Sequence, residues 1–287
     1  NWGMSKKLYS RGWLSSRGRG MKKEYPLNRG IINRVTKLFT FVPRPALAMI
    51  TKDIKVFFRD FGQWSQFLIY FGILVIYIFN LRNMPLSVDN VYWKVIITFL
   101  NLSATALVLA GFTVRFLFPV ISLEGNKIWL LGLAPISFRN VLFQKFIIYL
   151  LFILFVSEFL MISTNIMLES NALLFYMSCG IAAMASFGLV GLSIGLGSLY
   201  PNFREDNTAR IVSGFGGTLN FVIALLYVSF IIVSFALPYF SYEIKQIISE
   251  KTFVFSIVTA AVITISVTAL VSLLPIFVGY RKLENME

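Results

Sequence analysis

Residues Ser170 to Phe203 have the sequence SNALLFYMSCGIAAMASFGLVGLSIGLGSLYPNF, without a single charged side chain. A transmembrane helix needs about 20 mostly apolar residues to cross a hydrocarbon layer of about 30 Å, so this run is longer than one crossing requires. A strand of a membrane barrel would instead alternate over about 10 residues. The run therefore predicts a membrane-spanning helix.

Five other apolar runs predict further spans, and together they indicate an all-α polytopic membrane protein with six transmembrane helices. The expected bounds are about 62–81, 94–116, 141–163, 171–198, 211–236 and 252–279. Span three is accepted although Glu158 interrupts it. Pro238 predicts a break after span five, with room for a short interfacial or re-entrant helix around Ala236 to Ser249.

Composition excludes several kinds of chemistry. Of the 287 residues, 57% are hydrophobic and 14% are charged, which is too apolar for a soluble enzyme of this size. The chain has no histidine and one cysteine, Cys179. Metal, Cys/His and Ser/His/Asp sites are therefore not expected.

The basic residues set the expected orientation, because cytoplasmic loops carry an excess of Lys and Arg. With the N-terminus inside, all but four of the 26 basic residues lie on the cytoplasmic side. The four on the outer side are Arg82, Lys94, Lys245 and Lys251. Both termini are thus expected to be cytoplasmic, in a bacterial or organellar inner membrane.

The two ends of the chain are expected to be cytoplasmic tails. Residues 1–43 form a basic tail suited to anionic lipid, with nucleic acid a weaker alternative, and residues 281–287 form a second tail. The chain opens with Asn1 instead of Met and lacks a signal-peptide pattern, so we expect that an upstream piece is missing.

Residues 44–61 predict an amphipathic helix ahead of span one. Apolar side chains recur at helical spacing, and charged ones fill the other side, namely Lys52, Asp53, Arg59 and Asp60. Such a helix is expected to lie in the plane of the membrane, with its apolar face at the acyl boundary. The alternative is an ordinary amphipathic linker.

The inner loop between spans two and three, Leu117 to Gln144, is unusually apolar for a segment that faces water. Leaving its large apolar side chains exposed would cost about 1.5–3 kcal/mol each. Two interpretations remain open. A short helix anchored by Trp129 docks into a partner protein, or the loop packs against its own spans.

These segments resemble a known family. SLEGNKIWLLGLAPIS, Ser122 to Ser137, resembles the coupling-helix loop of type-2 ATP-binding-cassette exporter permeases, and TKDIKVFFRDFGQWSQ, Thr51 to Gln66, resembles their connecting helix. LYPNFREDNTARIVSGFGGTLN, Leu199 to Asn220, and the Leu8 to Trp13 stretch are similar to the C-terminal six-span half of a large exporter permease.

The resemblance implies a permease subunit that couples ATP hydrolysis to transport by alternating access. The chain lacks the Gly-x-x-x-x-Gly-Lys-Ser/Thr motif that cradles phosphates. We therefore expect that it is not an enzyme and binds no cofactor, and that ATP and Mg²⁺ bind to a partner ATPase subunit. A second six-span half and membrane lipids are the other expected partners. A non-transporting membrane scaffold is the alternative function.

The resemblance also implies which residues contact the ATPase. These are Glu124, Gly125, Ile128, Trp129, Leu130, Leu133, Pro135, Arg204, Glu205 and Asp206. Glu124 is the prime candidate for coupling, although a structural role as a helix cap is an alternative. The Arg204 to Arg210 cluster could equally form local ion pairs.

Two charged residues lie within or near the spans. Glu158 could contact substrate, pair with Lys94, or be tolerated in protonated form. Arg115, near the inner end of span two, is expected to snorkel or to contact the coupling loop. The small residues of span four favour close packing within the chain, with an interface between permease halves as the alternative.

Overall fold

The protein is described from a computed structural model, which covers residues 51–53, 61–82, 91–127, 138–205, 207–243 and 246–284. The chain divides into two compact units, Asn1–Phe61 and Gly62–Glu287. Within the described residues there is no strand, so the all-α class is confirmed for this part of the chain.

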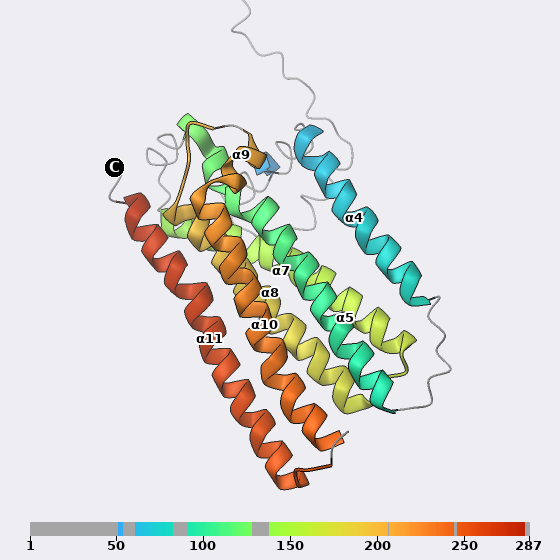
Figure 1. Ribbon diagram of the computed structural model, residues 1–287. Helices are drawn as coiled ribbons and strands as arrows, with labels where there is room; N and C mark the ends of the chain where they lie inside the picture. Colours follow the sequence, from blue (N-terminus) through green and yellow to red (C-terminus); the bar gives the residue numbers. More distant parts are fainter. Residues whose placement is uncertain are drawn as a thin grey trace, which may run out of the picture. The chain divides into compact units, whose positions relative to one another are not determined.

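Long helices of alternating direction make up the second unit (Figure 1). They are α4 (Phe61–Arg82), α5 (Val91–Phe112), α7 (Phe138–Met167), α8 (Ala172–Leu199), α10 (Phe215–Glu243) and α11 (Glu250–Glu284), with the short α9 (Thr208–Ser213) between α8 and α10. Short connections between antiparallel neighbours are typical of helix bundles.

Five helical segments of the described chain are long and apolar enough to cross a membrane. They are Trp93–Gly125, Phe138–Met167, Ala172–Leu199, Phe215–Glu243 and Glu250–Glu284. The first predicted span forms α4, a helix of 22 residues, but α4 is not among the five. The count of six spans therefore stays a prediction.

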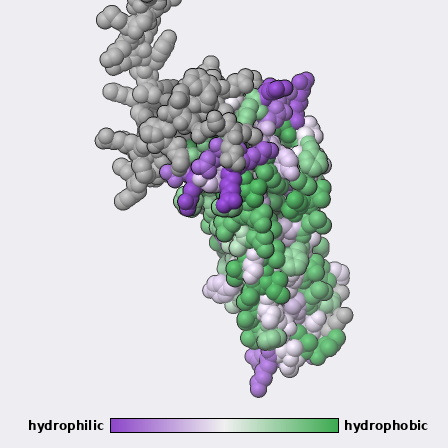
Figure 2. Space-filling view, turned by 90° about the vertical axis from the view of Figure 1, so that its left-hand side faces the viewer, coloured by the Kyte–Doolittle hydropathy of each residue, from purple (hydrophilic) through white to green (hydrophobic). Residues whose placement is uncertain are grey.

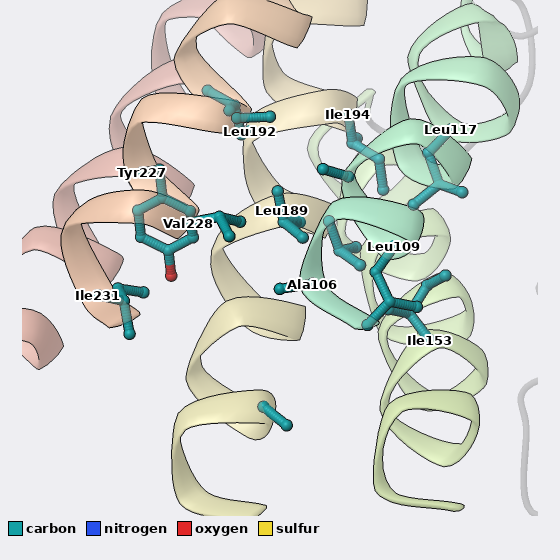
Figure 3. Close-up of a cluster of buried hydrophobic side chains, with 14 of the residues drawn as sticks. Ala106, Leu109, Leu117, Ile153, Leu189, Leu192, Ile194, Tyr227, Val228 and Ile231 are labelled. Carbon is teal, nitrogen blue, oxygen red and sulfur yellow. The ribbon is translucent and has the colours of Figure 1, made fainter. Parts of the chain in front are cut away.

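α8 is the central helix, with 72% of its most apolar window buried inside the protein. Side chains from α5, α7 and α10 surround it, and Figure 3 shows Leu189, Leu192 and Ile194 of α8 among them. The other labelled members of this cluster are Ala106, Leu109, Leu117, Ile153, Tyr227, Val228 and Ile231.

The small residues of α8 allow α11 to approach closely. A side chain at Gly195 would place its Cβ 2.6 Å from the backbone nitrogen of Ile276, and one at Gly191 would overlap Ser272. Both partners lie on α11, so close packing within the chain, the first of the two interpretations, is confirmed for these glycines.

Two details of the spans differ from the predictions. α10 continues through Pro238 to Glu243, so the separate helix expected around Ala236 to Ser249 is wrong. A proline removes one backbone hydrogen bond, which a helix within a packed bundle tolerates.

α5 continues as a π-helical turn, Thr113–Leu117, followed by 3₁₀ turns at Phe118–Val120 and Ser122–Lys127.

Candidate coupling site at the basic end of the bundle

One end of the bundle carries most of the positive charge of the described residues, and we call it the basic end. Its basic side chains are Arg115, Arg139, Lys145, Arg204, Arg210, Arg281 and Lys282. α8 and α11 end there, and α7 and α10 begin there (Figure 1). Hydrophilic residues gather toward the ends of the molecule, and the face between them is largely apolar (Figure 2).

A buried ion pair lies at the basic end. Lys145 Nζ, in the second turn of α7, lies 3.1 Å from Glu124 Oε1, and the two side chains are only 4% and 12% exposed. The free-energy cost of burying two charges is offset only when they are paired in good geometry. Glu124 lies in the predicted coupling-helix loop, Ser122 to Ser137, ahead of its apolar residues 128–137, which we call the coupling segment. Lys145 follows that segment. The pair therefore ties together the two flanks of that segment.

The backbone turns sharply immediately after Glu124. Gly125 has φ 57° and ψ −147°, a region that is almost exclusive to glycine. The amide of Glu124 donates to the Ile121 carbonyl, 3.1 Å away, which fixes the turn from the other side. Gly125, predicted only as a contact residue, thus also has a structural role, because the backbone of this turn requires glycine.

The loop after α8 is held against the same segment. The backbone N–H of Asn202 donates to Ser122 Oγ over 3.0 Å, and Ser122 is fully buried. Lys282 Nζ of α11 donates to the Leu199 carbonyl at the end of α8, 2.8 Å away. A lysine on the last carbonyls of a helix satisfies groups that the helix leaves unbonded. The ends of α5, α8 and α11 are thereby linked.

The predicted ATPase contact at Arg204, Glu205 and Asp206 is only partly described. Arg204 is exposed and belongs to the loop between α8 and α9. Glu205 pairs with Arg210 at 3.5 Å, in partly exposed positions, so the local ion pair considered from the sequence is present. Asp206 lies outside the described residues, as do Ile128, Trp129, Leu130, Leu133 and Pro135.

Arg115 lies on the π-helical turn and contacts α4. Its Nε donates to Gln66 Oε1 over 2.9 Å. The side chain also lines a cavity of about 260 Å³ between α4, α5, α9 and α10. The contact with Gln66 was not predicted, because nothing in the sequence relates two polar residues on separate helices.

Glu158 lies on α7, and its side chain contacts α8. The Cys179 thiol of α8 is its hydrogen-bonding neighbour, and the Oε1 atom is buried without a partner among the described residues. No ion pair joins Glu158 to Lys94 in the described part of the chain. Neighbouring contacts are also polar, since Ser186 donates to Ser157 and Asn165 to Ser178, each over 2.8 Å.

The predicted connecting helix is described at three residues only. Thr51, Lys52 and Asp53 are helical, and Lys52 Nζ lies 3.5 Å from Asp53 Oδ1. Arg59 and Asp60 lie outside the described residues.

Lys145 and Ser122 are the site residues that sequence reasoning missed. A signal for Lys145 was available, because it is a lysine inside a predicted span and such a residue needs a partner. Among the acidic residues at the basic end, Glu124 is the nearest to Lys145 along the chain. Ser122 had no comparable signal, since its partner is a backbone amide about 80 residues away in the chain.

The helices, the apolar surface between their ends and the charged basic end define an integral membrane protein built from helices. A protein-family model described as "Putative ATP-binding cassette" matches residues 2–287. The chain belongs to that family, which relates it to ATP-driven transport. Neither the curated proteins nor the solved structures contain a match to it.

This match corrects one prediction. The missing phosphate-binding motif predicted that the chain is not an enzyme, whereas an ATP-binding cassette normally hydrolyses ATP. That prediction is wrong, because the chain belongs to a family described as an ATP-binding cassette, and the absence of one phosphate-binding motif does not exclude ATP hydrolysis.

Proposed function

We propose that this chain is the membrane-spanning permease part of an ATP-driven exporter. The buried pair of Glu124 and Lys145 is the observation that carries the proposal, because it connects the predicted coupling segment to α5 and α7. Membership of an ATP-binding-cassette family and five helices suited to a membrane support it.

In this proposal, movement at the basic end is transmitted to the spans through a small number of rigid contacts. A push on residues 128–137 acts on α5 through Glu124 and on α7 through Lys145. The Ser122 contact passes it to the end of α8, and Lys282 links α8 to α11. Rigid elements joined in this way can shift together between inward-open and outward-open states.

The proposal extends to the partners and the location. An ATPase domain acts at the basic end through the coupling segment and the Arg204 loop, and a second six-span half completes the transport path. Membrane lipids surround the spans, and no nucleic acid is involved. The basic end faces the cytoplasm of a bacterial or organellar inner membrane, in accord with the excess of Lys and Arg there.

Purification from native membranes tests this function. The full chain is extracted in mild detergent, co-purifying proteins are identified by mass spectrometry, and Mg²⁺-dependent ATP hydrolysis is measured before and after the partners are separated. We expect ATP hydrolysis in the complex and a second six-span half. Activity that stays with the chain after separation places the ATPase site on this polypeptide, and activity that leaves places it on a partner.

The same sample can contradict the proposal. A reproducible complex with neither ATP hydrolysis nor an ATPase polypeptide would favour the membrane scaffold. The Glu124→Gln variant adds a direct test of coupling, with Glu250→Gln, a change at an exposed glutamate of the opposite end of the bundle, as the control. Equal ATP hydrolysis and equal partner binding in both variants would remove the role of the buried pair in coupling.

A further inference from the structure

The cavity beside Arg115 is the feature of the bundle that the proposed function does not use. It has a volume of about 260 Å³ and lies toward the basic end. Its lining residues come from four helical elements and the π-helical turn, and they are Tyr70, Gly111, Val114, Arg115, Val212, Gly217, Thr218 and Phe221. All of them belong to the second compact unit.

Arg115 gives this cavity a positive charge that the described residues do not neutralise. Its Nε donates to Gln66, and no carboxylate among the described residues forms an ion pair with its guanidinium. A guanidinium has five N–H donors, so most of its hydrogen-bonding capacity remains for a ligand. Gln66 holds one edge of the group and thereby fixes its orientation.

The backbone at Arg115 is also unusual. Residues Thr113–Leu117 form a π-helical turn, a conformation that is rare and often occurs at functional sites. The cavity also adjoins Gly217 and Thr218, in the first turn of α10, where the partial charge of a helix is positive. This contribution is secondary to that of Arg115 and has the same sign.

The rest of the lining is largely apolar, and it includes exposed residues of α10. Tyr70, Val114, Val212 and Phe221 supply rings and methyl groups, and Phe221 is 42% exposed. Thr218 is exposed as well, so the opening lies on the α10 side. The volume is slightly below the roughly 300–1,000 Å³ of complete small-molecule sites, which suits a head group whose tail lies outside.

We propose that this cavity binds the phosphate of an anionic amphiphile, with Arg115 as the phosphate-binding residue. A planar guanidinium matches the geometry of phosphate with two parallel hydrogen bonds. The apolar opening toward α10 accommodates the acyl chains. This site is independent of the proposed transport function, since binding requires neither ATP nor a partner.

Equilibrium binding to the detergent-purified full chain tests the proposal without ATP. The probes are a short-chain phosphatidylglycerol and the phosphatidylcholine of the same chain length. We expect the anionic lipid to bind more tightly, and Arg115→Gln to weaken its binding by about tenfold or more, because hydrogen bonds to charged groups are worth about 1.5–3 kcal/mol. Arg204→Gln, a change at an exposed arginine of the same end, should leave binding unchanged.

A second variant separates loss of the site from loss of the fold. Thr218→Leu adds bulk at the opening from an exposed position, and we expect it to weaken binding while the thermal unfolding temperature stays that of the wild type. Inorganic phosphate distinguishes the source of the ligand. Displacement of phosphatidylglycerol by millimolar phosphate means that the site takes soluble phosphates too, and no displacement means that the lipid is the ligand.

Two results would overturn the proposal. One is equal binding of the two lipids by the wild-type chain. The other is an Arg115→Gln variant that binds phosphatidylglycerol as tightly as Arg204→Gln does.

Discussion

Lys145 Nζ and Glu124 Oε1 lie 3.1 Å apart, and this largely buried pair joins the two flanks of the segment predicted to hold the coupling helix. This contact makes Glu124 part of the structure of the basic end. A role in coupling and a role in stability are therefore not alternatives for this residue, because a rigid attachment is what a coupling segment needs.

The buried ion pair predicts a large loss of stability when one partner is replaced and a smaller loss when both are replaced. Glu124→Gln leaves the Lys145 charge buried without its carboxylate, which costs about 3–5 kcal/mol in comparable cases. We expect a clearly lower thermal unfolding temperature in detergent. The double variant Glu124→Gln with Lys145→Met should recover much of the loss, because no uncompensated charge remains.

Glu205→Gln is the matched control for this prediction. The pair of Glu205 and Arg210 is partly exposed, and such pairs contribute about 0–1 kcal/mol. A similar drop in unfolding temperature for Glu124→Gln and Glu205→Gln would show that burial of the first pair has no energetic consequence. Additive effects in the double variant would show that Glu124 and Lys145 do not interact.

The glycines of α8 predict a second set of effects. Gly195→Ala would place a Cβ 2.5 Å from Pro275 Cβ and 2.6 Å from the Ile276 nitrogen, so α11 must move away. Overpacking of this kind typically costs about 1–3 kcal/mol. Gly180→Ala is the control on the same helix, since nothing lies within 4 Å of its Cβ position.

Thermal unfolding of the two alanine variants measures this difference. Gly180→Ala should be neutral or slightly stabilising, by up to about 1 kcal/mol, because alanine favours the helix. Equal unfolding temperatures for both variants would contradict the close contact between α8 and α11. That result would return the small residues of α8 to the interpretation as an interface between permease halves.

A hydrogen bond between α10 and α8 provides a third prediction. The buried Tyr227 hydroxyl donates to the Met184 carbonyl over 2.8 Å and lies 2.9 Å from Thr268 Oγ1. Tyr227→Phe removes both contacts and should destabilise the protein by about 0.6–1.7 kcal/mol, the range for such bonds within membranes. Tyr176→Phe, at a 73% exposed position, should have no effect on the unfolding temperature. Equal stability of the two variants would show that the Tyr227 hydroxyl makes no net contribution.

Some features of the fold could be predicted from the sequence and others could not. The helical fold was predictable, because long uncharged runs such as Ser170 to Phe203 permit few other structures in a membrane. The close packing of Gly191 and Gly195 was predictable as a tendency, but its partner, α11, was not. The proline at position 238 was misleading, since the sequence does not show that the surrounding bundle supports a helix there.

The candidate site was predictable only in part. Glu124 was identified from a resemblance, yet its partner Lys145 is separated from it by the whole coupling segment. Pairing between distant residues depends on how α5 and α7 pack, which the pattern of a single sequence does not encode. The cavity beside Arg115 could not be predicted for the same reason, because its lining comes from helices far apart in the chain.

Glu158 provides the last prediction, which decides between the roles considered for it. The described residues give it no ion pair with Lys94, and its Oε1 atom is buried without a partner. A neutral side chain of the same shape would avoid the cost of burying a charge, so Glu158→Gln should unfold at the same temperature as the wild type or higher. Lys94→Gln should have a small effect, and the two changes should be additive. A coupling energy above about 1 kcal/mol in this double-mutant cycle would restore the pair with Lys94. If the effects are additive and Glu158→Gln still abolishes transport in the reconstituted complex, Glu158 acts on the transport path, because its loss then changes function without changing stability.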